Sequence, residues 1–312
     1  MKPVVVGLGA MNLDRLLRVD KIVREGEAPA EGMLLAPGGS AANTIYALAR
    51  LGVATGFIGA VGDDEEGRRL IADLEGQGVD TSHIAVKPGV PTGTIFGLVD
   101  KKGHRTLYAL PGANARLTPE DIDLDYINQA SFLHLSSFVD EEQLRLERNL
   151  LERLSPRVKV SFAPGQLFTS RGLGALAPII RRSHILFLNR VEIEELAGGD
   201  FRTATQRLGQ NMGCSLVVVT LGGKGGKVCH IGEGRNEHLL EAAVQPEAIV
   251  DSTGAGDAFA AGVLFGLLNG EKIITAARLG ELMAARCLGE MGARSGLPTR
   301  EELLRTYRKL FS

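Results

Sequence analysis

Apolar residues in this chain occur either in short continuous runs or at helical spacing. The short runs predict buried strands at residues 4–8, 57–61, 132–135, 158–162, 185–188 and 216–220. Helical spacing predicts helices over residues 41–51, 65–75, 140–154, 255–268, 273–288 and 300–310. Strands that alternate with helices in this way are typical of an α/β fold, in which a mostly parallel central sheet carries helices on both faces.

Two stretches interrupt this alternation. Residues 16–36 and 94–109 have strand-like patterns with no helix between the strands, and residues 94–108 have the pattern of a β-hairpin. We expect these stretches to form a small β lid, contributed by about residues 13–36 and 91–110. Because no linker, repeat or low-complexity tract appears, we expect a single domain over residues 1–312.

The composition is that of an ordinary globular protein, with 44% hydrophobic residues, 23% charged residues and a net charge of −2. Nothing in it indicates a nucleic-acid surface or a membrane-binding stripe. The three cysteines are far apart, which predicts neither a disulfide framework nor a zinc site. The first apolar run is too short for a signal peptide, and no run approaches the roughly 20 residues of a membrane span. We therefore expect a cytoplasmic protein.

The strongest chemical signal is a glycine-rich turn that leads directly into an apolar helix at residues 251–262. The backbone amides of Gly254, Ala255 and Gly256 and the helix N-terminus would face one point, where they can stabilise charge on a phosphoryl group in transfer. Asp257 follows them, where its carboxylate can take the proton from an attacking hydroxyl. A capped helix start would explain the same residues without any catalysis.

A second glycine motif precedes the first long helix. Gly38 and Gly39 let a ligand approach the backbone closely, and Asn43 can both donate to and accept from a hydroxyl of a polyol. A simple helix cap is again the alternative interpretation.

These two motifs, in this order and roughly two hundred residues apart, resemble those of the ribokinase-like (PfkB) family of sugar kinases, and the resemblance covers nearly the whole chain. Three shorter motifs between and before them are similar to family motifs as well. They are Asn12-Leu13-Asp14, Asn189-Arg190-Val191-Glu192, and the Thr-Leu-Gly-x-x-Gly loop that begins at Thr220.

The resemblance implies a ribokinase-like fold and a phosphotransferase that uses ATP and Mg²⁺ with an alcohol group as acceptor. The residues that it assigns to the acceptor are Asn12, Asp14, Gly38, Gly39 and Asn43. Those that it assigns to ATP are Asn189, Thr220, Gly222, Gly225 and Thr253. It also implies that Glu192 helps to place Mg²⁺ through water, that Asp251 lies near a site for K⁺, and that two chains pair through their lids.

Other functions remain open. Ser40 and Ser136 stand where ribokinases carry Lys and Glu, which weakens the case for ribose, whereas residues 161–166 and 279–282 are similar to nucleoside and adenosine kinases of the same family. A non-catalytic sugar- or nucleotide-binding protein is the alternative from another class. A Rossmann dehydrogenase is disfavoured because Asn12 stands where the third glycine of the fingerprint should be, and no P-loop sequence occurs.

Overall fold

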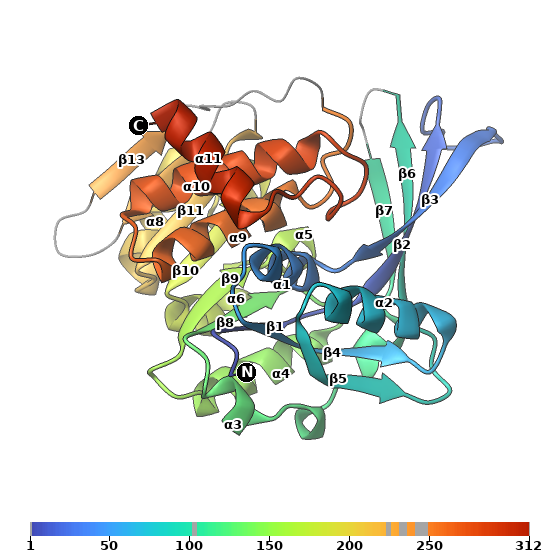
Figure 1. Ribbon diagram of the computed structural model, residues 1–312, viewed down its shortest axis with the longest axis horizontal. Helices are drawn as coiled ribbons and strands as arrows, with labels where there is room; N and C mark the ends of the chain where they lie inside the picture. Colours follow the sequence, from blue (N-terminus) through green and yellow to red (C-terminus); the bar gives the residue numbers. More distant parts are fainter. Residues whose placement is uncertain (1, 102–104, 223–225, 231–235, 241–248, 312) are drawn as a thin grey trace.

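The computed structural model describes residues 2–101, 105–222, 226–230, 236–240 and 249–311. Within them a large sheet of nine strands has the order β13-β12-β11-β10-β9-β8-β1-β4-β5, in which the seven strands from β11 to β5 are parallel (Figure 1). Strands β12 and β13 extend this sheet in antiparallel fashion. The strands are β1 (Val5–Leu8), β4 (Thr55–Gly62), β5 (Asp80–Lys87), β8 (Phe132–Ser136), β9 (Lys159–Ala163), β10 (Ile185–Asn189), β11 (Leu216–Thr220), β12 (Gly226–His230) and β13 (Asn236–Leu240).

Helices cover both faces of this sheet, and each face has its own hydrophobic core. One core contains side chains from α1 (Ser40–Arg50), α2 (Glu65–Gly76), α9 (Ala255–Leu268), α10 (Ile273–Leu288) and α11 (Arg300–Phe311). The other contains side chains from α3 (Leu124–Ile127), α4 (Glu141–Arg153), α5 (Gly165–Thr169), α6 (Leu173–Arg182), α7 (Arg190–Ala197) and α8 (Phe201–Met212). The predicted α/β fold is therefore confirmed.

The continuous apolar runs of the sequence are explained by these two cores. In β11, Leu216 and Val218 lie in the first core, and Val217 and Val219 lie in the second. Because successive side chains of a strand point to opposite faces, a strand buried on both faces needs an apolar residue at every position.

A second sheet of four strands stands beside the first (Figure 1). Its order is β3-β2-β6-β7, with bounds Ala30–Gly38, Asn12–Val19, Gly93–Asp100 and Arg105–Leu110. The antiparallel pairing of β6 with β7 confirms the predicted hairpin. Its strands lie in and next to the two segments expected to form a lid, and we call it the lid sheet. That it closes over a substrate, and that residues 1–312 act as one domain, stay predictions.

Helix α9 is fixed by unusually close packing against α10. A Cβ atom added at Gly262 would lie 2.6 Å from the Cα of Gly280, and one added at Gly266 would lie 2.7 Å from the Cα of Ala276. The two backbones therefore approach each other at glycine positions in the middle and the C-terminal half of α9, which fixes this helix against α10. No helix in the described part of the chain has both the length and the apolar character needed to cross a bilayer.

Candidate active site

Most of the predicted site residues lie at one edge of the large sheet, where its parallel strands end. Asn189 and Thr220 are the last residues of β10 and β11, and they are direct neighbours in the strand register. Ser136 ends β8, and its Oγ accepts a hydrogen bond of 3.0 Å from the backbone N–H of Ala41 in α1. The carboxyl edge of such a sheet is where open α/β proteins bind ligands.

Asp257 lies in the first turn of α9, and its carboxylate is held by the first turn of α1. Ser40 Oγ donates to Asp257 Oδ1 at 2.7 Å, and Asn43 Nδ2 donates to Asp257 Oδ2 at 2.9 Å. Burial raises the pKa of Asp257 above its ordinary value, and the two hydrogen bonds offset part of that rise. The carboxylate is thus positioned on both oxygens and is more basic than a solvated aspartate.

An arginine that the sequence analysis missed determines how Asn43 is oriented. Arg294 Nε donates to Asn43 Oδ1 at 2.9 Å, and Arg294 also pairs with Asp73 and lies over the ring of Tyr46. Because a guanidinium only donates, it must face the oxygen of the Asn43 amide, and the amide nitrogen is left to face Asp257. Nothing near Arg294 in the sequence indicates this role, since it lies 251 positions from Asn43.

The glycine turn before α9 has a geometry that only glycine allows. Gly254 has a φ of 76°, and a Cβ atom there would lie 2.4 Å from the Cβ of Ala293. The first N–H groups of a helix have no partner within the helix, so those of Gly254 and Gly256 can receive an anion. The N–H of Ala255 makes only a long hydrogen bond of 3.4 Å to the carbonyl oxygen of Ser252, which an anion could replace.

Asp251 ties this turn to the loop that follows α10. Its Oδ1 accepts from the backbone N–H and the Oγ of Thr253, at 2.9 and 2.7 Å, and its Oδ2 accepts from the N–H of Gly292 at 2.9 Å. Both oxygens of this buried carboxylate are therefore engaged within the protein. Asp251 was predicted to lie near a site for K⁺, and these bonds give it a structural role as well.

Asp14 projects from β2 into a tight space beside Gly38. A Cβ atom at Gly38 would lie 2.3 Å from Asp14 Oδ1, and Gly39 has a φ of 102° with its Cβ position 2.1 Å from the carbonyl oxygen of Ala10. Asp14 is 8% exposed, and its Oδ1 has no hydrogen-bond partner among the described residues. Burial is the main reason why the pKa of Asp14 rises to about 7, and the nearby charges of Asp257 and Asp251 also raise it.

Asn12 begins the same strand, two residues before Asp14. Its Oδ1 accepts a hydrogen bond of 2.9 Å from Asn114 Nδ2, and the same nitrogen donates to the carbonyl of Met11. Asn114 thus fixes the start of β2. Contact of Asn12 with an acceptor stays a prediction.

Asn189 and Glu192 form a capping box at the start of α7. Asn189 Oδ1 accepts from the N–H of Glu192 at 2.9 Å, and Glu192 Oε2 accepts from the N–H of Asn189 at 2.8 Å. Burial raises the pKa of Glu192, and the charges of Asp257 and Glu195 raise it further. Gly222 is exposed after β11, whereas Gly225 lies outside the described residues.

The side chains at this site suit a magnesium ion that is held mainly by the phosphate oxygens of a bound substrate and by water. Within the described residues, no group of three or more His, Cys, Asp or Glu side chains is arranged to hold a metal. Mg²⁺ is typically bound by one or two carboxylates together with water and substrate phosphates. Glu192 fits the role of such a carboxylate. Its surroundings disfavour its charged form, and a bound cation would favour that form again.

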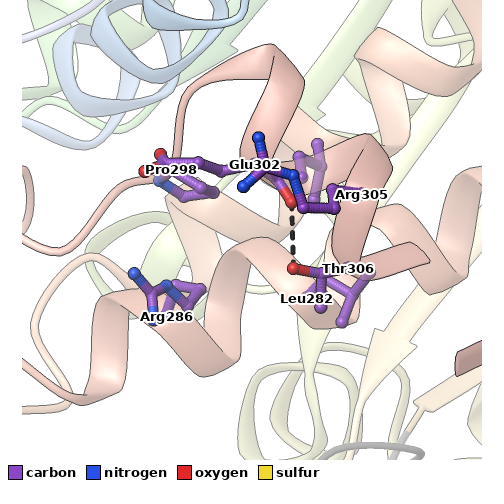
Figure 2. Close-up of a pocket in the computed structure, with 7 residues that line it drawn as sticks. Leu282, Arg286, Pro298, Glu302, Arg305 and Thr306 are labelled. Atoms are coloured by element: carbon purple, nitrogen blue, oxygen red, sulfur yellow. Dashed lines mark hydrogen bonds between the residues drawn. The ribbon is translucent and has the colours of Figure 1, made fainter. Parts of the chain in front are cut away.

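A separate cavity of about 160 Å³ lies between α10 and α11 (Figure 2). None of the predicted site residues lines it, and it is bounded by Leu282, Arg286, Pro298, Glu302, Leu303, Arg305 and Thr306. It is therefore distinct from the candidate active site.

Comparison with known proteins agrees with this geometry. A family model described as pfkB family carbohydrate kinase matches residues 2–300. An uncharacterized sugar kinase of Archaeoglobus fulgidus is 41% identical over 80% of this chain and 98% of its own length, and an ATP-dependent ribose-1-phosphate kinase of Halopiger xanaduensis is 34% identical over 93% and 94%. The crystal structure of a ribokinase from Thermotoga maritima superposes with a TM-score of 0.84 at 28% identity, covering 98% of this chain and 99% of that one.

The predicted ribokinase-like fold is thus confirmed, together with the predicted family. The matched region runs from the first strand to the start of the last helix and includes both glycine motifs. The chain belongs to the pfkB family of carbohydrate kinases.

Proposed function

We propose that this protein transfers the γ-phosphoryl group of ATP to a hydroxyl of a sugar or sugar-like acceptor, with Asp257 as the general base. The observation that carries the proposal is the position of the Asp257 carboxylate in the first turn of α9, directly after the amides of residues 254–256. A base and an anion site that adjoin each other are what phosphoryl transfer to an alcohol requires.

In this reaction the acceptor oxygen forms a bond to the γ-phosphorus, and the bond from that phosphorus to the β–γ bridging oxygen breaks. The hydroxyl proton passes to Asp257, and the products are a phosphate ester and ADP. The amides of Gly254, Ala255 and Gly256 stabilise the charge on the transferring group. The hydrogen bonds from Ser40 and Asn43 keep the carboxylate directed toward the acceptor.

Asn189, Thr220 and Gly222 would bind the nucleotide at the ends of β10 and β11, and Thr253 would do so at the turn before α9. Glu192 would hold Mg²⁺ through water, where the ion supplies charge neutralisation for the phosphates. A K⁺ ion beside Asp251 remains part of the proposal, and dependence of the rate on added K⁺ would test it.

The acceptor would lie against Asp14, Gly38 and Gly39. Its class remains to be chosen among sugars, sugar phosphates and nucleosides. The ribose-1-phosphate kinase relative, at 34% identity, favours including a sugar phosphate. Nucleosides remain the alternative within the family, because they too present a primary hydroxyl.

The lid sheet also supports the proposed homodimer. Met33, Phe96, Tyr108 and Leu110 are 44–65% exposed, and the strand register places them on one face, opposite to that of Asp14. Light scattering of the purified protein would test this pairing. Action in the cytoplasm likewise remains a proposal.

The decisive experiment is ATP turnover with a panel of pentoses, hexoses, sugar phosphates and nucleosides. We expect activity with at least one acceptor, and a loss of about 100-fold or more in Asp257→Asn while nucleotide binding persists. ATP binding without turnover on any acceptor would favour the non-catalytic binding protein. Full activity of the Asp257→Asn protein would show that the base is another group.

A further inference from the structure

Cys287, a fully buried residue near the end of α10, contacts both segments that frame the anion site. Its Sγ lies 3.4 Å from the carbonyl oxygen of Thr253, in the turn before α9, and 3.6 Å from that of Ala293, in the loop after α10. A thiol is a weak donor, and its single proton is shared between these two oxygens. Because burial and the charges of Asp257 and Asp251 raise the pKa of Cys287 to about 12, the thiol keeps this proton.

The contact with Thr253 fixes the orientation of the peptide unit that joins this residue to Gly254. A peptide unit is planar, and in the trans form its C=O and N–H point in opposite directions. The described residues contain no cis peptide bond, so the N–H of Gly254 points away from the sulfur. No backbone carbonyl of the described residues accepts from that N–H, which belongs to the proposed anion site. The thiol thus holds this peptide unit from its carbonyl side.

The second contact, with Ala293, connects the same thiol to the surroundings of the base. A Cβ atom added at Gly254 would lie 2.4 Å from the Cβ of Ala293, so the turn and the loop touch each other. The next residue of the loop is Arg294, which orients Asn43 beside the base. One sulfur therefore lies between the segment that provides the amides and the segment that carries the arginine behind the base.

We propose that Cys287 is a positioning residue, which directs the N–H of Gly254 toward the transferring phosphoryl group by binding the carbonyl of Thr253. The inference rests on the proposed kinase function and adds a support for its anion site. Backbone amides stabilise developing charge most when they are held in place before the reaction, because no reorganisation is then needed during the transfer. A serine would retain this support, since its hydroxyl also donates, whereas an alanine would not.

The test compares Cys287→Ala and Cys287→Ser with the matched control Cys214→Ala, each with the best acceptor of the panel. Cys214 is equally buried, and its Sγ also contacts two carbonyl oxygens, those of Leu216 at 3.3 Å and His184 at 3.8 Å. It precedes β11 and so lies at the edge of the large sheet opposite to the site.

In Cys287→Ala we expect kcat to fall by about 10-fold, less than on loss of a whole oxyanion donor, because the N–H of Gly254 is loosened and not removed. KM for the acceptor and for ATP should change little. Cys287→Ser should keep kcat within a few-fold, and Cys214→Ala should keep it unchanged. Both alanine variants remove a buried sulfur, so both should lower the unfolding temperature to a similar extent. If Cys287→Ala does not fold, Cys287→Val replaces it, because valine fills the place of the sulfur without a donor.

Three results would overturn the inference. The first is a wild-type kcat in Cys287→Ala. The second is a loss in Cys287→Ser as deep as that in Cys287→Ala, which would show that the donor has no part in the effect. The third is an equal loss in Cys214→Ala, which would assign the effect to a general loosening of the core. The proposed function is judged separately, by the turnover of the wild-type protein and its loss in Asp257→Asn.

Discussion

Asp14 is expected to lower the stability of this protein at the pH where it functions. Its side chain is 8% exposed, one of its oxygens has no hydrogen-bond partner among the described residues, and Gly38 packs directly against it. Asp257 and Asp251 add negative charge nearby, and Arg294 and Arg105 compensate only in part. Replacing the carboxylate by a neutral amide of the same shape in Asp14→Asn should therefore stabilise the fold.

The size of the effect follows from the pKa of Asp14, which rises from 3.8 to about 7 on folding. Each unit corresponds to about 1.4 kcal/mol, so about three units give an upper bound of ~4 kcal/mol. The folded state holds the proton of Asp14 more tightly than the unfolded state does. The loss in the free energy of unfolding is therefore absent below pH 4, grows as the pH rises toward 7, and is constant above pH 7. Asp14→Asn should remove this dependence, and it should also weaken binding of the acceptor.

Urea unfolding of both proteins at several pH values between 5 and 8.5 measures this directly. The free energy of unfolding of Asp14→Asn should exceed that of the wild type at pH 8, by an amount that shrinks as the pH falls toward 5. Asp63→Asn is a suitable control, because that carboxylate is exposed and its ion-pair partner within the described part of the chain is the exposed Arg68. Parallel pH profiles of wild type and Asp14→Asn would refute the reasoning, as would a lower stability of Asp14→Asn at pH 8.

Two further predictions concern the groups around the base. Arg294→Gln should lower the free energy of unfolding by about 3–5 kcal/mol in urea titrations, because it leaves a carboxylate and the Asn43 amide without their cation; an unchanged midpoint would contradict this. Glu192→Gln can keep the capping box through its amide oxygen, so the protein should unfold like the wild type and yet need a higher Mg²⁺ concentration for half-maximal turnover. An unaltered Mg²⁺ dependence would exclude Glu192 from the metal site.

The elements that the sequence predicted best are those whose burial is uniform. The predicted bounds of α9 and α10 agree with the structure, because α9 is apolar on all sides and each helix is bounded by polar or glycine residues. Strand β5 was missed because none of its residues is fully buried, so its pattern shows neither a continuous apolar run nor a clear alternation. The short helices α5 and α7 were missed as well, since five to eight residues carry too little periodicity to detect.

The same contrast applies to the site. Residues that lie in local motifs, such as Asp257 and Gly254, could be predicted because a glycine turn before an apolar helix has a recognisable chemistry. Arg294 and Arg105 could not, since each reaches the site from a distant segment through contacts that only the folded chain creates. The structure thus adds the cations of the site to the carboxylates and glycines that the sequence predicted.

These contacts also bear on which acceptor is bound. The hydroxyl of Ser40 donates to Asp257, and that of Ser136 accepts from the backbone of Ala41. Both serines therefore support the base and its helix. The exchange of the Lys and Glu of ribokinases for serine at these positions alters the surroundings of the base as well as two contacts to the sugar. A lysine at position 40 would lie beside Asp257 as a cation, lower its pKa and weaken it as a base.

Among the polar groups around the base, the unpaired oxygen of Asp14 remains available to an acceptor. In its charged form Asp14 only accepts hydrogen bonds, so it favours any acceptor with a free hydroxyl at that point and does not by itself distinguish sugars, sugar phosphates and nucleosides.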